Sequence, residues 1–512
     1  MTPADTTTGI LLTDQYQLAM AQTYFREGIH ERPAQFDYTF RSYPDYGTHQ
    51  AGYCVFAGLD PLLAWMETAC FGDAEIELLA SQRTSTGKPR FDRAFLDWLA
   101  VHGHFKDIEV RAAAEGRVVH PLAPLAIITG PLAMGQILET SLLNHLNYPT
   151  LIATKASRVH EAARGRPVLE FGMRRGPADG VTAGSRAALI GGADFTSNVG
   201  ISHAVGIDPK GTHAHSMVQA FMALGEGELE AFRAFAATYP DDCILLVDTI
   251  NTLDSGVPNA ITVFRELEEK GHKPGGIRLD SGDLAYLSIQ AAKQLNDAGF
   301  GDVAIVLSSN LDELAIWQIL SQIEEEAPRY GVDPANLTSR LMYGVGTRLI
   351  TSQGHAALDG VCKLVAIEDG GTWKPAIKVS DSPAKVPIPG LKQVWRVTDS
   401  RGYATADVVA TAEEPRPGGQ RLVLHHPIRE GVQRTLEQAE VAGAEELLRP
   451  VFGDGRRLET PTIAEMRERR AADVELLDPG VRRLVNPHFY HVSLTQEIKD
   501  LQRRLVEEAR AG

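Results

Sequence analysis

Two histidines stand one residue apart in the segment GTHAHSMV, residues 211–218. In an extended segment alternate side chains share a face, so His213 and His215 would point the same way, as a metal-binding H-x-H pair does. Such a site needs a third ligand and usually a fourth, drawn from other strand ends. The later histidines His272 and His355 lie in the loop-like sequences GHKPGG and SQGHAA. We therefore expect His213 to be a structural histidine, and a metal-dependent hydrolase on a barrel is kept as a remote alternative.

Charged and small polar residues gather where short apolar runs stop, between residues 168 and 347. Arginines or acids end VLEFGMRRG, CILLVDT and GIRLDSGD, whereas Ser-Ser-Asn and Gly-Val-Gly-Thr end VAIVLSSN and LMYGVGT. The residues at these run ends are Arg174, Arg175, Asp248, Arg278, Asp280, Asp283, Ser308, Ser309, Asn310, Gly344, Gly346 and Thr347. Small donors let backbone N–H groups approach phosphate oxygens, so the last two run ends predict a phosphorylated ligand. The candidate phosphate-binding residues there are Ser308, Asn310, Gly346 and Thr347.

The segment RLDSGD places Arg278 inside an apolar run and two acids around Ser-Gly. Mg²⁺ takes oxygen ligands and usually combines one or two carboxylates with substrate phosphates. We therefore expect Asp280 and Asp283 as magnesium ligands, with Asp248 as a further candidate. The alternative is that one or more of these acids pairs with Arg278 in a structural salt bridge.

The segment EFGMRRG, residues 170–176, places an aromatic ring beside two arginines. Arginine binds carboxylate or phosphate through a bidentate fork and also stacks on flat rings. Together with the later run ends, this segment predicts a site for a flat ring, with cations that recognise a carboxylate and loops that hold a phosphate.

The elements that must position these residues alternate between strand-like runs and helical stretches such as residues 285–299 and 312–326. Alternation of this kind favours parallel β/α architecture, and units of roughly thirty residues fit an irregular β/α barrel. An open doubly wound sheet is the competing fold, which the lack of a GxGxxG or Walker motif after these runs disfavours. In a barrel the active site lies at the carboxyl ends of the strands, where the polar residues gather.

A chain of 512 residues predicts two or three domains. We expect an N-terminal α+β domain over residues 1–140 and a catalytic barrel over 141–390. Residues 391–512 would form a C-terminal segment that packs with the N-terminal domain and ends in an amphipathic helix. Its apolar face would carry Leu494, Ile498, Leu501 and Leu505.

The composition excludes several classes of protein. A formal net charge of −16 argues against a general nucleic-acid binder. The N-terminus lacks the pattern of a signal peptide, and the longest apolar stretch, residues 121–135, is interrupted by prolines and too short to span a bilayer. The four cysteines are widely spaced with no CxxC pair, which favours neither zinc nor a disulfide framework. We expect a cytoplasmic protein without a membrane or nucleic-acid partner.

Several short motifs together resemble the nicotinate phosphoribosyltransferase family. They are LLTDQYQLAM near the N-terminus, EFGMRRG, DFTSNVG, GTHAHS, DTINT, RLDSGD, SSNLDE, GVGT and GVCKLV. Each motif is ordinary alone, whereas their joint occurrence from about residue 10 to about residue 395 is specific.

This resemblance implies an irregular α/β barrel joined to a domain built from both chain ends, working as a homodimer with shared active sites. The implied reaction joins nicotinate to 5-phosphoribosyl 1-diphosphate and yields nicotinate mononucleotide and diphosphate, in the salvage route to NAD. ATP hydrolysis is coupled to it through a transient phosphohistidine, and Mg²⁺ is the expected cofactor.

The same resemblance assigns the nicotinate-binding residues by motif match. Thr212 lies beside nicotinate, and Arg278 meets its carboxylate. Phe171 matches a position that stacks on the pyridine ring. Tyr16, in LLTDQYQ, reaches the ring in the partner subunit's site.

Phosphate binding and catalysis are assigned in the same way. Arg174 and Thr347 match positions that clamp phosphate, and His215, just before a serine, is the residue that ATP would phosphorylate. A neutral imidazole is a competent nucleophile toward the γ-phosphate. Because loss of diphosphate builds positive charge on the ribose, we add the hypothesis that Asp248 and Asp280 stabilise that charge.

Three further alternatives stay open. Nicotinamide phosphoribosyltransferase shares the fold and mechanism but must recognise an amide, and Asp194 sits near where an amide-accepting acid could lie. Quinolinate phosphoribosyltransferase is disfavoured because its chains are much shorter and need no ATP. A catalytically silent relative that only binds nucleotides or a partner is disfavoured by the presence of His215, Arg278, Asp280 and Thr347.

Overall fold

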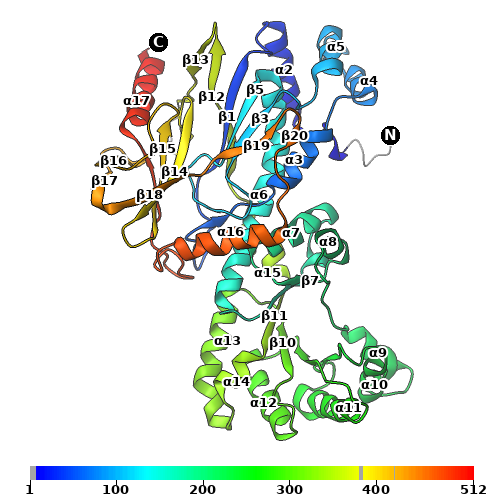
Figure 1. Cartoon of the computed structure of the whole chain (residues 1–512). Coiled ribbons are helices and arrows are strands. Elements are labelled where there is room, and N and C mark those ends of the chain that lie inside the picture. Colours follow the sequence, from blue (N-terminus) through cyan, green and yellow to red (C-terminus); the bar gives the residue numbers. More distant parts are fainter. Residues whose placement is uncertain (1–6, 380–384, 420, 512) are drawn as a thin grey trace. The chain divides into compact units, whose positions relative to one another are not determined.

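The computed structural model describes residues 7–379, 385–419 and 421–511, which form two compact units (Figure 1). One unit combines the described residues up to Leu151 with those from Ala357 onward, and the other runs from Ile152 to Ala356. These limits differ from the expected barrel limits at 141 and 390, because β12 (Gly360–Asp369) pairs antiparallel with β1 (Pro33–Phe40) of the first unit. Among the described residues, no helix is both long and apolar enough to cross a membrane.

The second unit is built on a parallel sheet of six short strands. They are β6 (Val168–Glu170), β7 (Phe195–Thr196), β8 (Ile244–Leu246), β9 (Gly276–Leu279), β10 (Ala304–Ser308) and β11 (Leu341–Val345). Their order in the sheet is β7-β6-β11-β10-β9-β8, and neighbouring strands pair in parallel throughout. This is the cyclic chain order of a β/α barrel whose ring is open between β7 and β8. The prediction of an irregular β/α barrel is confirmed.

Helices follow the strands and cover the sheet (Figure 1). They are α7 (Ala178–Gly191), α8 (Val199–Val205), α9 (His215–Ala223), α10 (Glu228–Thr238), α11 (Val257–Glu269), α12 (Leu284–Asp297), α13 (Glu313–Glu326), α14 (Pro334–Ser339) and α15 (Thr347–Ile350), with the short turns η1 (Met173–Arg175), η2 (Thr252–Gly256) and η3 (Ala327–Tyr330). The strands are apolar and buried on both faces, as parallel strands under helices must be. Aspartates just after β9 and β10 start the next helices: Asp283 accepts from the backbone N–H of Tyr286, and Asp312 from that of Ala315.

The first unit carries two larger sheets to which both ends of the chain contribute. The seven-stranded sheet has the order β13-β12-β1-β5-β3-β19-β20, and the six-stranded sheet has the order β17-β16-β21-β15-β14-β18. Besides β1 and β12, the strands are β2 (Cys54–Val55), β3 (Glu109–Ala112), β4 (Val118–Val119), β5 (Ala126–Pro131), β13 (Thr372–Pro375), β14 (Lys392–Asp399), β15 (Ala404–Thr411), β16 (Leu422–His425), β17 (Gln433–Leu436), β18 (Val441–Glu446), β19 (Arg449–Gly453), β20 (Arg456–Arg457) and β21 (His491–Leu494). The fold-class prediction of an α+β domain built from N- and C-terminal segments is thereby confirmed.

The helices of the first unit are α2 (Gln15–Arg26), α3 (Leu59–Thr68), α4 (Asp73–Ser81), α5 (Arg93–His102), α16 (Ile463–Leu476), α17 (Gln496–Ala511) and the turn η5 (Gln438–Glu440), while α6 (Leu132–Ala162) contains the boundary with the second unit. The expected amphipathic helix at the end of the chain is α17, with Ile498 fully buried. The assignment of Leu494 to that helix is wrong: it lies in β21, and the helix begins only at Gln496.

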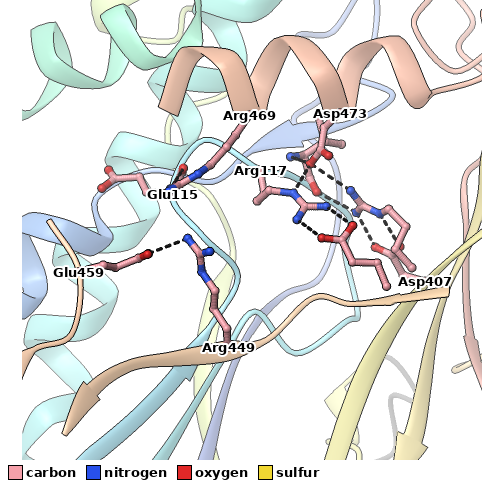
Figure 2. Close-up of polar contacts among 10 residues, drawn as sticks. Glu115, Arg117, Asp407, Arg449, Glu459, Arg469 and Asp473 are labelled. Carbon is pink, nitrogen blue, oxygen red and sulfur yellow. Dashed lines mark hydrogen bonds and ion pairs between the residues drawn. The ribbon is translucent and has the colours of Figure 1, made fainter. Parts of the chain in front are cut away.

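A buried ionic network joins α16 to the strands of the first unit (Figure 2). Arg396 of β14 makes a bidentate contact with Asp407 of β15, at 2.9 Å for each bond. Asp473 of α16 accepts from Arg396 at 3.2 Å and from Arg117 at 2.7 Å, and Arg117 also binds Glu445. Because breaking a buried pair leaves an uncompensated charge, loss of Arg396 or Asp407, which are almost fully buried, would cost about 3–5 kcal/mol. Through Arg117, this network therefore connects the C-terminal segment to the N-terminal part of the first unit.

Candidate active site

Arg278 joins the ends of β9 and β10 to the segment before α9 through three different nitrogens. From β9, its Nε donates to Ser308 Oγ at 2.8 Å, its Nη1 to Thr212 Oγ1 at 3.1 Å and its Nη2 to Asp280 Oδ1 at 3.0 Å. A guanidinium carries five N–H donors, so two have no partner among the described residues and remain for a ligand. The cation is thus held rigidly in place and still able to form a two-pronged contact with a carboxylate.

Phe171 supplies a flat ring beside this cation. The Cζ atom of Arg278 lies 5.4 Å from the centroid of the Phe171 ring, within the range of a cation–π contact. A Cβ atom on Gly344 would come within 2.6 Å of that ring, so the neighbouring strand β11 needs glycine at this position. The run ends of β6, β9 and β11 therefore lie next to one another, with the ring of Phe171 between Arg278 and Gly344.

Glu170 fixes the turn that presents Phe171, and the sequence analysis missed it. Its buried carboxylate accepts hydrogen bonds from Thr196 Oγ1 at 2.7 Å, from Ser185 Oγ at 2.9 Å and from the backbone N–H of Gly172. A charge at the end of the apolar run VLE was the available signal, because a buried carboxylate must find donors.

His215 lies between two carboxylates and a threonine. Its Nε2 is 3.9 Å from Asp248 Oδ1 and 3.8 Å from Asp280 Oδ2, and its Nδ1 is 3.0 Å from Thr249 Oγ1. Thr249 is a second residue that the sequence analysis missed, although it directly follows Asp248 at a run end. The hydroxyl holds one ring nitrogen, while the other faces a gap lined by negative charge.

Asp248 and Asp280 are held as a pair. Asp248 Oδ2 accepts from the backbone N–H of Asp280 at 3.1 Å and from Ser281 Oγ. Asp248 Oδ1 is buried and has no hydrogen-bond partner among the described residues. An oxygen in that state is ready to accept a cation or a donor from a ligand.

His213 has partners different from those of His215. Its Nε2 accepts from the backbone N–H of Leu246 at 3.0 Å, and burial lowers its pKa to about 4. The nitrogen that an H-x-H metal pair would use is therefore occupied by the backbone, in agreement with the expected structural role. Within the described residues, no cluster of three or more His, Cys, Asp or Glu side chains could hold a metal ion.

Three sequence models of one protein family together match most of this chain, including the residues of the site. The model of the nicotinate phosphoribosyltransferase N-terminal domain matches residues 11–147. The model of the nicotinate phosphoribosyltransferase family matches residues 168–399, and that of the C-terminal domain of the same enzyme matches residues 391–502. The chain belongs to the nicotinate phosphoribosyltransferase family.

Similar proteins agree with this family membership. The nicotinate phosphoribosyltransferase of Bacillus subtilis is 36% identical over 517 residues, covering 97% of each chain. A crystal structure of human nicotinic acid phosphoribosyltransferase, 30% identical, covers 96% of this chain and 99% of that chain at a TM-score of 0.78. A nicotinate-nucleotide pyrophosphorylase structure from Pyrococcus furiosus, 22% identical, covers 93% and 97% at a TM-score of 0.65, which is a likeness of fold alone.

The loops after β10 and β11 carry the family motifs SSNLDE and GVGT. Ser309 and Asn310 are exposed and have positive φ angles of 95° and 50°. Asparagine tolerates this conformation, whereas it is costly for serine, and such strain is often found at functional sites. Thr347 begins α15 behind Gly346. Arg348 Nη1 donates to Asp312 Oδ2 at 2.6 Å, so an ion pair connects the two loops.

Ser308 has partners other than the predicted phosphate. Its buried hydroxyl accepts from Arg278 and donates to Asp280 Oδ1. The structure therefore places Ser308 among the groups that hold Arg278.

Three other candidate residues have exposed side chains within their own units. Asp283 is exposed and caps α12, and Arg174 is exposed in η1. Tyr16 lies on α2 of the first unit, with 52% of its surface exposed. Their assigned roles stay predictions.

Proposed function

We propose that this protein transfers the phosphoribosyl group of 5-phosphoribosyl 1-diphosphate to nicotinate, giving nicotinate mononucleotide and diphosphate in the salvage of NAD. The pyridine nitrogen forms the new bond to C1 of the ribose as the bond from C1 to diphosphate breaks. The observation that carries the proposal is Arg278, which keeps two N–H donors beside the ring of Phe171 while three protein oxygens hold it. A flat ring bearing a carboxylate is the ligand that such a pair fits.

Nicotinate is favoured over nicotinamide by the state of Asp194. That acid was the candidate acceptor for an amide N–H, but its Oδ2 already accepts from the backbone N–H of Val168 at 2.9 Å. Arg278 has donors to offer and no lone pair to accept with, so it suits a carboxylate better than an amide nitrogen.

Asp248 and Asp280 are proposed to stabilise the positive charge that develops on the ribose. They also fit a magnesium ion better than the pair Asp280 and Asp283, because Asp283 caps α12 whereas Asp248 Oδ1 is buried without a partner among the described residues. Bound Mg²⁺ would offset charge on the diphosphate. The loops with Asn310 and Thr347 are proposed to bind phosphate, as is Arg174.

His215 is proposed to accept the γ-phosphoryl group of ATP. An imidazole nitrogen forms the bond to phosphorus as the bond to the ADP oxygen breaks, and water later releases phosphate from the histidine. Thr249 orients the ring, and the adjacent carboxylates Asp248 and Asp280 would respond to the added negative charge. Phosphorylation thereby changes the charge where diphosphate leaves, which couples ATP hydrolysis to synthesis.

The active form is proposed to be a cytoplasmic homodimer in which Tyr16 contacts the pyridine ring in the partner subunit's site. The exposure of Tyr16 supports this, because an aromatic residue open to solvent in one chain is available to a second.

The decisive experiment measures nicotinate mononucleotide formation with and without ATP, with nicotinamide at equal concentration as the competing substrate. We expect product from nicotinate, more of it with ATP, and acid-labile phosphate on His215. Faster turnover of nicotinamide would favour the alternative enzyme. A His215→Ala variant that remains fully coupled to ATP would remove the phosphohistidine step.

A further inference from the structure

The open seam of the barrel is filled by the segment that carries Thr212 and His215. Strands β7 and β8 have no pairing with each other in the described sheet. On one side the backbone N–H of Lys210 donates to the carbonyl of Thr196 in β7, at 3.0 Å. On the other side His213 Nε2 accepts from the N–H of Leu246 in β8, at 3.0 Å. Residues 210–213 therefore stand where a further strand pairing would close the ring.

The bond to Leu246 satisfies a donor at the edge of β8, which no other described strand pairs with on that side. The neighbouring N–H of Val247 donates to Arg278 of β9, and N–H groups alternate in direction along a strand. The N–H of Leu246 thus points to the open side of β8. An unpaired edge donor buried there would cost free energy, and the His213 ring supplies the acceptor.

The His213 ring is held in the neutral form whose Nε2 can accept a hydrogen bond. Only 8% of its surface is exposed, and its ring centroid lies 4.9 Å from that of Phe235 and 6.0 Å from that of Phe232. Its Nδ1 lies 3.4 Å from the carbonyl of Ala214, which leaves Nε2 as the acceptor. Burial, by lowering the pKa of the ring, keeps it neutral near pH 7.

The flanking residues face the reaction site. Thr212 Oγ1 accepts from Arg278 at 3.1 Å, and His215 Nδ1 lies 3.0 Å from Thr249 Oγ1. Among the described residues no ladder of backbone hydrogen bonds aligns this segment with β8, so the His213 side chain holds it to the strand itself, while His215 holds it to Thr249 just beyond the strand end.

We propose that His213 is a positioning residue, which sets the spacing of Thr212 and His215 by binding the open edge of β8 and so couples nicotinate binding to phosphorylation. The proposal rests on the proposed role of His215. It distinguishes His213 from an ordinary core histidine, because its loss would change substrate affinity and ATP coupling rather than stability alone.

The test compares His213→Phe, which keeps an aromatic ring and removes the acceptor, with His213→Gln, which returns an acceptor oxygen at similar reach. His272→Gln is the control, because His272 pairs with Asp241 at the surface of the same unit. For each variant we would measure the KM for nicotinate, kcat, the ATP hydrolysed per nucleotide formed, and hydrogen exchange of residues 244–248. We expect His213→Phe to raise the KM for nicotinate about tenfold, to waste ATP and to expose the Leu246 amide. His213→Gln should stay within about threefold of the wild type.

Two results would overturn the proposal. One is an unchanged KM and coupling ratio in His213→Phe. The other is equal damage in His213→Phe and His213→Gln, which would make the residue purely structural. If His213→Phe does not fold, His213→Asn replaces it, since its shorter side chain cannot reach Leu246. Failure of the wild type to form nicotinate mononucleotide would instead refute the proposed function, independently of any variant.

Discussion

At the scale of single residues, Arg278 is the side chain that holds several groups of the candidate site together. It contacts oxygens of Thr212, Asp280 and Ser308 through separate nitrogens. Lysine in its place would be a point charge that cannot hold three partners and a ligand together. We expect Arg278→Lys to lower kcat/KM for nicotinate about a hundredfold and to reduce its preference over nicotinamide. Steady-state kinetics with both pyridines measures this, and Arg233→Lys at the surface pair with Glu266 is the control. Retained preference in Arg278→Lys would contradict the assignment.

The lowered pKa of His213 also leads to a prediction of how the free energy of unfolding depends on pH. Burial is the main cause that lowers its pKa to about 4, with Arg278 and His215 acting in the same direction and the Ala214 carbonyl opposing them. In the unfolded chain the pKa is about 6.5, so the unfolded state binds more protons between these two values. The free energy of unfolding should therefore be fully retained above about pH 6.5 and fall by on the order of 3 kcal/mol as the pH drops to 4.

The matching measurement compares denaturation midpoints of the wild type and His213→Gln across this range. The glutamine variant lacks the titrating group, so its stability should decline less as the pH is lowered. Parallel declines in the two proteins would mean that other groups account for the acid sensitivity.

At the scale of elements, the loops after β10 and β11 act as a connected pair. Asp312 both caps α13 and binds Arg348 of α15, the short helix that follows β11. Asp312→Asn keeps a side chain that can cap a helix and removes the charge. We expect it to raise the KM for the phosphoribosyl donor by about threefold to tenfold, with little change in the KM for nicotinate.

Arg348→Ala should have the same effect, and the double variant should be no worse than either single one, since both remove one interaction. Steady-state kinetics with each substrate varied in turn measures these changes. Additive losses, or equal changes in both KM values, would argue that the pair does not set the spacing of the phosphate loops.

The sequence predicted strand ends better than strand partners. Short apolar runs that stop at polar residues located β6, β8, β9, β10 and β11, because buried parallel strands are apolar on both faces, but not the two-residue strand β7. The run CKLVAIED of β12 has the same pattern, yet it pairs antiparallel with β1 of the other unit. An apolar run does not reveal which sheet it joins. Likewise, Glu170, Thr249 and Ser308 bind groups brought close only by folding, so their hydrogen bonds were not predictable from local sequence.

At the scale of the whole molecule, the proposed homodimer makes the site depend on two copies of the chain. His215 lies in the second unit and Tyr16 in the first. If Tyr16 serves the partner's site, a mixed dimer of Tyr16→Ala and His215→Ala chains contains one site with both residues intact. Random reassociation makes half of all dimers mixed, so about a quarter of the wild-type ATP-stimulated activity should return when the two variants, each lacking it, are mixed. Activity assays after unfolding and refolding the mixture measure this, with each variant refolded alone as the control. If Tyr16 acts within its own chain, every site in the mixed dimer lacks one residue and no activity returns.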